Sequence, residues 1–316
     1  MKIAVTGALG YIGCRLLQSL ASDPKFTAVL IDDLSAGNAA GLEALTPGRF
    51  SFYKEDVLEA DLKARFAGCD AVIHLAAIAD PAVSFARPEA VRRQNTEAVR
   101  RAAEACAAMG IPLIFPSSTS VYGEPNAVPD EDCASLLPQT PYAESKLLAE
   151  KVLQDAGRNA GLRFVVLRFG TIFGPSPGLR AHTAVGKFCL QAISGEPLTV
   201  WRTAYSQIRP YLYIEDAVRA LIFAARQELR PGEIYNVVTQ NAPLSRILDC
   251  LREEVPGLEW RETESPAMNS FSREIPSGKI RAAGFDFYGD LHRGICETLE
   301  SLAVKPGRAG HKSGQF

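Results

Sequence analysis

Three glycines, spaced three residues apart at positions 7, 10 and 13, follow directly on the first apolar run of the chain. Residues 2–5 have the composition of a β-strand, and residues 11–22 have the apolar spacing of a helix. Glycines at such a junction let the chain turn sharply, bring its backbone close to a diphosphate, and pack the helix tightly on the strand. The helix N-terminus adds free N–H groups and a partial positive charge. The segment therefore predicts a site for a diphosphate-containing cofactor, formed by Gly7, Leu9, Gly10, Tyr11, Ile12 and Gly13.

Short apolar runs alternate with helical patterns through the first half of the chain. The further strands are expected over residues 27–31, 49–54, 71–75, 112–116 and 164–168, and the further helices over 58–66, 88–109 and 142–159. Strands that are apolar on both faces and alternate with helices indicate a parallel sheet covered on both sides. Because crossovers between parallel strands are right-handed, we expect an α/β fold with a doubly wound, Rossmann-like sheet.

The regular alternation weakens after residue 173, where a turn cluster of glycine, proline and serine begins. Helices are expected over 183–194, 214–227 and 244–255, and short strands over 198–200 and 234–237. The sequence thus predicts a cofactor-binding domain over 1–173. A smaller, mainly substrate-binding lobe is expected over 174–304, with segments that return to the sheet. The tail 305–316, rich in glycine, lysine and serine, is expected to be disordered.

Composition excludes several classes of protein. The net charge of -2 offers no basic field for a polyanion, so no nucleic-acid partner is expected. No apolar stretch approaches the roughly 18 residues of a membrane span, and no secretory signal is recognisable. The seven cysteines are scattered without a CxxC pair, which favours reduced thiols in a cytoplasmic protein. His182 and His292 lack partners at metal-ligating spacing, so no metal site is expected.

Acidic residues follow the second and third expected strands. A carboxylate at Asp32, 19 residues beyond Gly13, can accept hydrogen bonds from a ribose 2′-hydroxyl and repel a 2′-phosphate. Asp33 adds a second negative charge, and no lysine or arginine follows closely. These features favour NAD over NADP. Asp56, followed by Val57, is a plausible partner for the adenine amino group.

A tyrosine and a lysine stand four residues apart at the start of an expected helix. The spacing puts Tyr142 and Lys146 on one helical face, directly after a proline suited to a helix start. An ammonium beside a phenol favours the phenolate, which can then act as a general base. Upstream, the strand over 112–116 ends in the hydroxyl cluster 117–120, which could hydrogen-bond a substrate oxygen.

Several motifs occur together in a characteristic order: TGALGYIG at 6–13, HLAA at 74–77, SSTSVYG at 117–123, YAESK at 142–146 and LRFGTIFGP at 167–175. This order resembles that of the extended short-chain dehydrogenases/reductases, and within them the NAD-dependent sugar-nucleotide epimerase/dehydratase family. RPYLYIEDAVRAL at 209–221 and YNV at 235–237 extend the resemblance, which is clear over residues 1–240.

The resemblance implies roles for individual residues. Tyr142 becomes the general acid/base, Lys146 the group that lowers its pKa and holds the nicotinamide ribose, and Ser118 the active-site hydroxyl. Cofactor contacts are implied for Leu75, Ala76, Ala77, Asn95, Ser117 and Phe169. Contacts with a nucleotide-linked sugar are implied for Ser84, Ser118, Thr119, Tyr142, Thr171 and Arg209, with the arginine on phosphate.

The chain also departs from the family pattern. The 4,6-dehydratases carry Asp and Glu directly after the active-site hydroxyl, whereas this chain has Thr119 and Ser120, which disfavours dehydration. Gly170-Thr171 replaces a Phe-Asn or similar pair, Pro210 replaces an Asp, and Tyr213 stands where His is frequent. The nucleotide and the sugar therefore stay open.

The leading hypothesis is 4-epimerisation of a nucleotide-linked sugar through a transient 4-keto intermediate. The alternatives are an NAD-dependent sugar or sugar-acid dehydrogenase/reductase with net cofactor turnover, and a non-catalytic NAD-binding regulator. The resemblance also implies a homodimer through the helices that begin near residues 88 and 142. The apolar positions Leu147, Leu148, Val152 and Leu153 suit that interface, although a helix packed on its own sheet shows the same stripe.

Overall fold

The computed structural model describes residues 1–35, 42, 48–124, 128–179, 183–264 and 272–303. A parallel seven-stranded sheet in the order β10-β6-β5-β4-β1-β2-β3 forms the centre of the molecule. Its strands are β1 (Lys2–Thr6), β2 (Thr27–Asp32), β3 (Phe50–Lys54), β4 (Ala71–His74), β5 (Leu113–Ser118), β6 (Phe164–Phe169) and β10 (Glu233–Val237).

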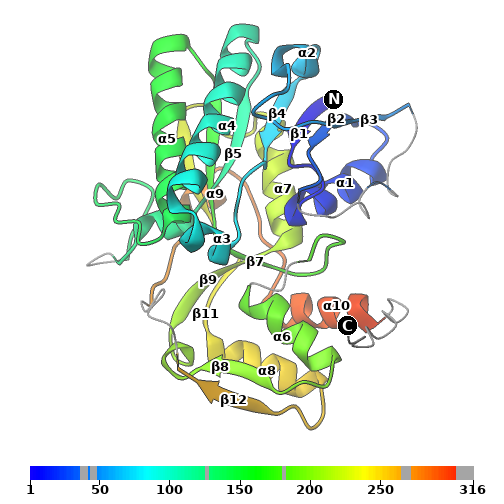
Figure 1. Ribbon diagram of the computed structural model, residues 1–316, viewed down its shortest axis with the longest axis vertical. Coiled ribbons are helices and arrows are strands. Elements are labelled where there is room, and N and C mark those ends of the chain that lie inside the picture. The colour runs from blue at the N-terminus through cyan, green and yellow to red at the C-terminus, as the bar shows by residue number, and fades with distance from the viewer. Residues whose placement is uncertain (36–41, 43–47, 125–127, 180–182, 265–271, 304–316) are drawn as a thin grey trace, which may run out of the picture.

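Helices cover both faces of this sheet (Figure 1). One face packs against α1 (Tyr11–Ser22) and α7 (Ile214–Ala225), and the other against α2 (Leu62–Phe66), α4 (Pro88–Met109) and α5 (Pro141–Ala160). A short helix, α3 (Pro81–Ala86), precedes α4.

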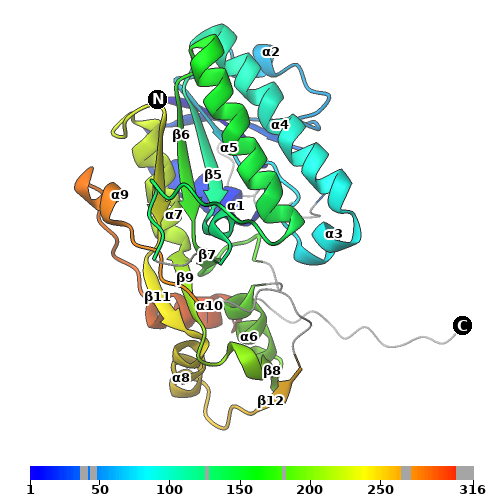
Figure 2. The ribbon, with the colours of Figure 1, turned by 90° about the vertical axis from the view of Figure 1, so that its left-hand side faces the viewer.

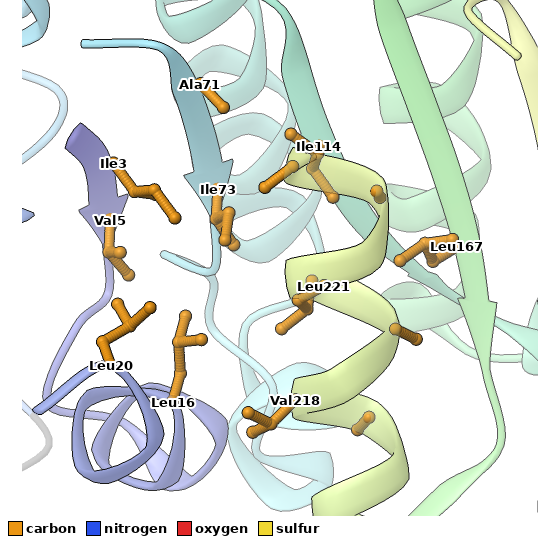
Figure 3. Packing of buried hydrophobic residues seen from close by; sticks show 14 of the residues in the cluster. Ile3, Val5, Leu16, Leu20, Ala71, Ile73, Ile114, Leu167, Val218 and Leu221 are labelled. Carbon is orange, nitrogen blue, oxygen red and sulfur yellow. The ribbon is translucent and has the colours of Figure 1, made fainter. Parts of the chain in front are cut away.

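Alternate residues of each central strand enter different cores. Ile3 and Val5 of β1 face α1 and α7, together with Ile73 of β4 (Figure 3), whereas Ala4 and Val72 belong to the opposite core. All five side chains are fully buried. This double burial explains why the strands are apolar at almost every position and do not alternate.

A smaller lobe lies beyond the carboxyl ends of the strands (Figures 1 and 2). Its three-stranded sheet contains β7 (Thr171–Phe173), β9 (Ile208–Tyr213) and β11 (Gln240–Pro243), and a separate pair joins β8 (Leu198–Trp201) to β12 (Trp260–Thr263). Its helices are α6 (Ala184–Ile193), α8 (Leu244–Glu254) and α10 (Leu291–Ala303), which share one core. α9 (Gly278–Ala282) packs against β10 of the main sheet.

The predicted fold class is confirmed. α1 and α4 have the expected bounds, and the strand expected over 234–237 is β10, at the edge of the main sheet next to β6. α3 and α10 were not expected, and the helix expected over 58–66 is confined to α2. The expected disordered tail lies outside the described residues. Within the described part of the chain, no helix is long and apolar enough to cross a bilayer.

Candidate active site

The glycine turn between β1 and α1 is tightly packed. Gly7 has a left-handed backbone with φ +66°, and a Cβ there would lie 2.5 Å from the backbone N of Ala76. A Cβ at Gly13 would lie 2.4 Å from the carbonyl O of Ala8. Gly10 is the N-cap of α1 and has no side chain over the helix end. The turn therefore packs backbone against backbone and leaves the N-terminus of α1 without a side-chain cap, which fits a dinucleotide diphosphate.

Asp32, the last residue of β2, hydrogen-bonds to this turn. It is 8% exposed, and its carboxylate accepts hydrogen bonds from the backbone N of Leu9 at 2.9 Å and of Leu34 at 2.9 Å. The carboxylate is thus fixed beside the glycine turn, where the ribose prediction requires it. Asp33 is exposed and accepts from the backbone N of Ser35 at 2.8 Å.

The residues predicted to lie beside the adenine follow β3 in the chain. One carboxylate oxygen of Asp56 accepts from the backbone N of Leu58 at 2.8 Å, which holds the turn after the strand. Val57 is buried in the core beneath that turn. The adenine contact of Asp56 stays a prediction.

The segment after β4 passes beside the glycine turn. Leu75, Ala76 and Ala77 are partly exposed there, and the backbone N of Leu75 donates to the carbonyl O of Thr6 at 2.9 Å. Asn95 of α4 fixes this segment, because its side-chain amide exchanges hydrogen bonds with the backbone N and O of Ile78 at 2.8 and 3.1 Å.

Asn95 also donates to the hydroxyl of Ser145 at 3.0 Å, one residue before Lys146. The structure therefore ties Asn95 to protein groups that position the cofactor segment and α5. Its direct contact with the cofactor stays a prediction.

The Tyr/Lys pair lies in the first two turns of α5. Pro141 occupies the first helical position, and the hydroxyl of Thr140 caps the helix by accepting from the backbone N of Ala143 at 3.1 Å. Lys146 is buried, and its ammonium donates to the carbonyl O of Pro116 in β5 at 2.8 Å. Its Nζ lies 5.7 Å from the centre of the Tyr142 ring. α5 thus holds the cation next to the phenol and to the end of β5.

Burial lowers the pKa of Lys146 to about 8, although the carboxylate of Glu150 opposes this shift. Glu150 lies one helical turn further along α5 and forms a buried ion pair with Arg168 of β6 at 2.7 Å. It also accepts a hydrogen bond from the hydroxyl of Ser117 at 2.5 Å. Ser117, predicted to contact the cofactor, therefore faces Glu150 inside the protein.

Ser118 ends β5 and caps the short 3-10 helix η2 (Thr119–Tyr122). Its hydroxyl is 2.9 Å from the hydroxyl of Ser120 and accepts from the backbone N of Ser120 at 3.2 Å. η2 packs against α5, which carries Tyr142. Ser118 is partly exposed, whereas Thr119 is buried. The hydroxyl cluster thus presents Ser118 on the side of the catalytic helix.

His74 has a structural role. It is fully buried, its Nδ1 is 2.8 Å from the hydroxyl of Thr6, and burial together with Lys146 lowers its pKa to about 3. The ring is therefore neutral.

Tyr11 and Phe169 are also buried, and the Tyr11 hydroxyl donates to the carbonyl O of Gly174 at 2.6 Å. Tyr11 thereby joins the cofactor helix to the segment that leads into the smaller lobe.

Two half-buried arginines lie near each other on the side of the smaller lobe. The first arginine, Arg209, lies in β9, and its Nη2 donates to Oε1 of Gln207 at 2.7 Å. The second is Arg273, whose backbone N donates to the carbonyl O of Ile208 at 2.9 Å. Burial, reinforced by the charge of Arg209, lowers the pKa of Arg273 to about 10. Two neighbouring cations of this kind would be stabilised by an anion such as a diphosphate.

Arg209 was predicted from the sequence to contact phosphate, and this role stays a prediction. Arg273 was not singled out, because it stands in an irregular stretch without any spacing signal. Two further predicted substrate contacts have different surroundings. Ser84 of α3 is buried, and its hydroxyl has no hydrogen-bond partner among the described residues. Thr171 is partly exposed at the start of β7. The buried hydroxyl of Ser84 is suited to binding a ligand, because leaving a buried hydroxyl without a hydrogen-bond partner is costly.

His292 was expected to lack partners at metal-ligating spacing, but two side chains of metal-ligating type lie beside it in the structure. Its ring lies beside Cys296, one helical turn away, and Glu254, which is distant in sequence. Donor atoms of the three side chains lie within 4.8 Å of one another. His182 lies outside the described residues.

A glycine turn on a doubly wound sheet, a carboxylate at the end of β2, and a Tyr/Lys pair at the start of α5 define an NAD-dependent enzyme of the extended short-chain dehydrogenase/reductase type. The profile described as the NAD dependent epimerase/dehydratase family matches residues 3–237, and the chain belongs to this family. The predicted family and the predicted cofactor, NAD, are confirmed.

The relatives of this chain include nucleotide-sugar epimerases. It is 34% identical over 247 residues to an uncharacterised UDP-glucose epimerase of Bacillus subtilis, covering 75% of this chain and 76% of the relative. It is 34% identical over 248 residues to the UDP-glucose 4-epimerase of Azospirillum brasilense, covering 73% and 70%. Among solved structures, UDP-glucuronic acid 4-epimerase from Bacillus cereus, in complex with UDP-glucuronic acid and NAD, superimposes with a TM-score of 0.87 at 26% identity, covering 96% of this chain and 99% of that one.

Proposed function

We propose that this protein is an NAD-dependent 4-epimerase of a UDP-linked sugar. The observation that carries the proposal is the position of Tyr142 and Lys146 in α5. Lys146 is anchored at the carbonyl O of Pro116 in β5, two residues before Ser118. The acid/base pair and the hydroxyl are thereby held at the carboxyl edge of the sheet, where doubly wound folds bind their ligands.

Each residue has a distinct chemical task. NAD, when bound on the glycine turn, supplies the hydride acceptor and donor of the reaction. The Tyr142 phenolate takes the proton from the C4 hydroxyl and returns it to the oxygen at the end of the reaction. The Lys146 ammonium stabilises the phenolate by its charge. Ser118 hydrogen-bonds the C4 oxygen, and Ser120 orients the Ser118 hydroxyl.

The site favours epimerisation over loss of water. Elimination needs an acid/base pair beside the active-site hydroxyl, and this chain has Thr119 and Ser120 there. Neither hydroxyl titrates near neutral pH, so neither can serve as that pair. A 4-keto sugar formed at this site therefore has no group at these two positions to complete a dehydration.

Arg209 and Arg273 are proposed to bind the substrate diphosphate. The UDP-sugar epimerases among the relatives support UDP as the nucleotide. Ser84 and Thr171 are proposed as sugar contacts, on the strength of the buried hydroxyl of Ser84 and the position of Thr171 at the start of β7.

We also propose a cytoplasmic homodimer. All seven cysteines are free thiols, which fits a reducing compartment. α4 and α5 lie side by side on one flank of the molecule (Figure 2), where a second copy could pack. Of the apolar stripe on α5, Leu153 is buried in its own core, Leu147 and Val152 pack partly against cores of their own chain, and Leu148 is exposed. Leu148 is therefore the side chain of this stripe best placed for an interface.

The test is to incubate the purified enzyme with UDP-glucose, UDP-galactose, UDP-glucuronic acid and UDP-N-acetylglucosamine and to separate the products. We expect one C4 epimer pair to interconvert without accumulation of NADH. Tyr142→Phe should lower kcat by about 10²- to 10⁴-fold, because general acid/base catalysis contributes that much. Tyr288→Phe, at an exposed tyrosine before α10, is the matched control and should keep full activity. Steady NADH production would instead identify a dehydrogenase.

A further inference from the structure

We propose that Glu254, His292 and Cys296 form a binding site for a divalent transition-metal ion, Zn²⁺ above others, on the smaller lobe. The site joins the end of α8 to the first turns of α10, two elements that lie next to each other (Figure 1). It is separate from the residues assigned to the cofactor and the substrate. Imidazole nitrogen, thiolate sulfur and carboxylate oxygen are the ligands that zinc prefers in proteins.

The donor atoms of the three side chains lie within 4.8 Å of one another. The Sγ of Cys296 is 3.5 Å from Nδ1 and 4.0 Å from Nε2 of His292. The Nε2 is 3.2 Å from Oε1 of Glu254. With Zn–S near 2.3 Å and Zn–N and Zn–O near 2.1 Å, tetrahedral angles place N and S about 3.6 Å apart and N and O about 3.4 Å apart. One ring nitrogen must face both other donors, and Nε2 is 3.2 Å from the carboxylate oxygen but 4.0 Å from Sγ. The imidazole ring or the Cys296 side chain must therefore rotate before the three donors can bind one ion through Nε2.

Two carboxylates share one ring nitrogen of His292 in this cluster. A second carboxylate, that of Glu253, is 3.3 Å from the same Nε2 of His292 that faces Glu254. One ring nitrogen carries at most one proton, so it cannot form good hydrogen bonds to both carboxylates at once. A metal ion bound among these donors neutralises the carboxylates and leaves the fourth coordination position to water or to Glu253.

The backbone favours a cation at the same place. Glu253 and Glu254 are the last two residues of α8, where the carbonyl end of the helix carries partial negative charge. Acidic side chains at this end are unfavourable unless a positive charge lies nearby, and Arg246 supplies one for Glu253 at 3.9 Å. His292 and Cys296 are four residues apart on α10 and therefore project from the same face. The metal would displace the thiol proton of Cys296 into solvent as the sulfur binds.

Metal binding would fasten α10 to the lobe that carries the substrate arginine. α10 packs against β7 and β9, and Tyr213 at the end of β9 donates a hydrogen bond to Glu297 of α10. Arg209 lies on the same strand. We therefore expect the ion to stabilise the smaller lobe and to take no part in the chemistry at Tyr142.

The test uses the tag-free full-length protein, freed of metal with a chelator and kept reduced. Titration with Co²⁺ should produce one equivalent of a complex with a thiolate-to-cobalt charge-transfer band, and Zn²⁺ should displace it. Cys296→Ser should abolish that band, and Glu254→Gln should weaken Zn²⁺ binding at least about tenfold, the lower end of what loss of a supporting group costs. Cys133→Ser, at another partly exposed cysteine, is the matched control.

Zn²⁺ should also raise the Tm of the wild type and of Cys133→Ser, and leave that of Cys296→Ser unchanged. Absence of the charge-transfer band in the wild type would overturn the proposal. So would a band that survives Cys296→Ser, or equal loss of Zn²⁺ affinity in Cys133→Ser. Epimerase activity of the metal-free protein is measured in parallel, so that failure of the metal site and failure of the proposed function are distinguishable.

Discussion

Lys146 is a cation held inside the protein by a small number of contacts. Its ammonium donates to the carbonyl O of Pro116 and lies 4.6 Å from the centre of the Phe115 ring. Burial lowers its pKa to about 8, so the lysine is charged below that pH and loses its charge as the pH rises through it. Because the charged form is the one that stabilises the Tyr142 phenolate, the activity is expected to fall on the alkaline side.

The Lys146 charge gives a pH prediction. kcat/KM should fall as the pH rises above about 8. Glu150→Gln removes the carboxylate that raises the pKa of Lys146, so this alkaline limb should move to lower pH. Glu144→Gln, on the same helix and paired with Arg92, is the control and should leave the limb in place. If the pH profile of kcat/KM of a folded Glu150→Gln variant coincides with that of the wild type, Lys146 is not the group that sets the alkaline limb.

At the scale of elements, the strand–turn–helix at the N-terminus was predictable because its signals are local. The glycine spacing fixes the turn, and α1 begins and ends at the expected residues. α4 likewise starts at Pro88 and ends before the left-handed Gly110, two local signals that the sequence displays.

α3 and α10 were not predicted, for different reasons. α3 has six residues, too few to establish a helical period. α10 did carry a signal, since Leu291, Ile295 and Leu299 are spaced four apart and all buried. Arg209 lies near Arg273, and Glu254 lies near His292, although each pair is distant in sequence. No local pattern encodes either pair.

The glycine turn gives a prediction with a close internal control. Gly7 and Gly161 have the same φ of +66°, but a Cβ at Gly161 meets nothing within 4 Å, whereas one at Gly7 meets the backbone of Leu75 and Ala76. Gly161→Ala should cost about 1 kcal/mol of stability through backbone strain alone. Gly7→Ala should cost more and should also deplete bound NAD, measured by extraction and absorbance. Equal NAD content in the two variants would contradict the assignment of this turn to the diphosphate.

At the scale of the whole molecule, the proposed site draws on both lobes. The main sheet and its covering helices carry the residues predicted to bind the cofactor and the proposed acid/base pair, and the smaller lobe carries Arg209. Tyr11 links the two, since it begins α1 and its hydroxyl bonds to Gly174 after β7. The division of the chain at residue 173 stays a prediction.

The proposed homodimer can be tested by measuring the mass of the protein in solution. Light scattering of the purified protein should give twice the chain mass, and Leu148→Asp should shift the population to monomer, because it places a charge in an apolar contact. Leu137→Asp, at an exposed leucine outside α4 and α5, should remain dimeric. A wild-type protein that is monomeric at micromolar concentration would contradict the proposed interface.

The central claim is that the enzyme inverts C4 and keeps its cofactor. The most direct measurement uses the UDP-sugar that turns over in the panel, labelled with deuterium at C4, and analyses the product by mass spectrometry and NMR. We expect the C4 epimer to form with deuterium retained at C4, while free NADH does not build up. Loss of deuterium from the sugar, together with NADH formed in proportion to the substrate consumed, would contradict the account and identify a dehydrogenase.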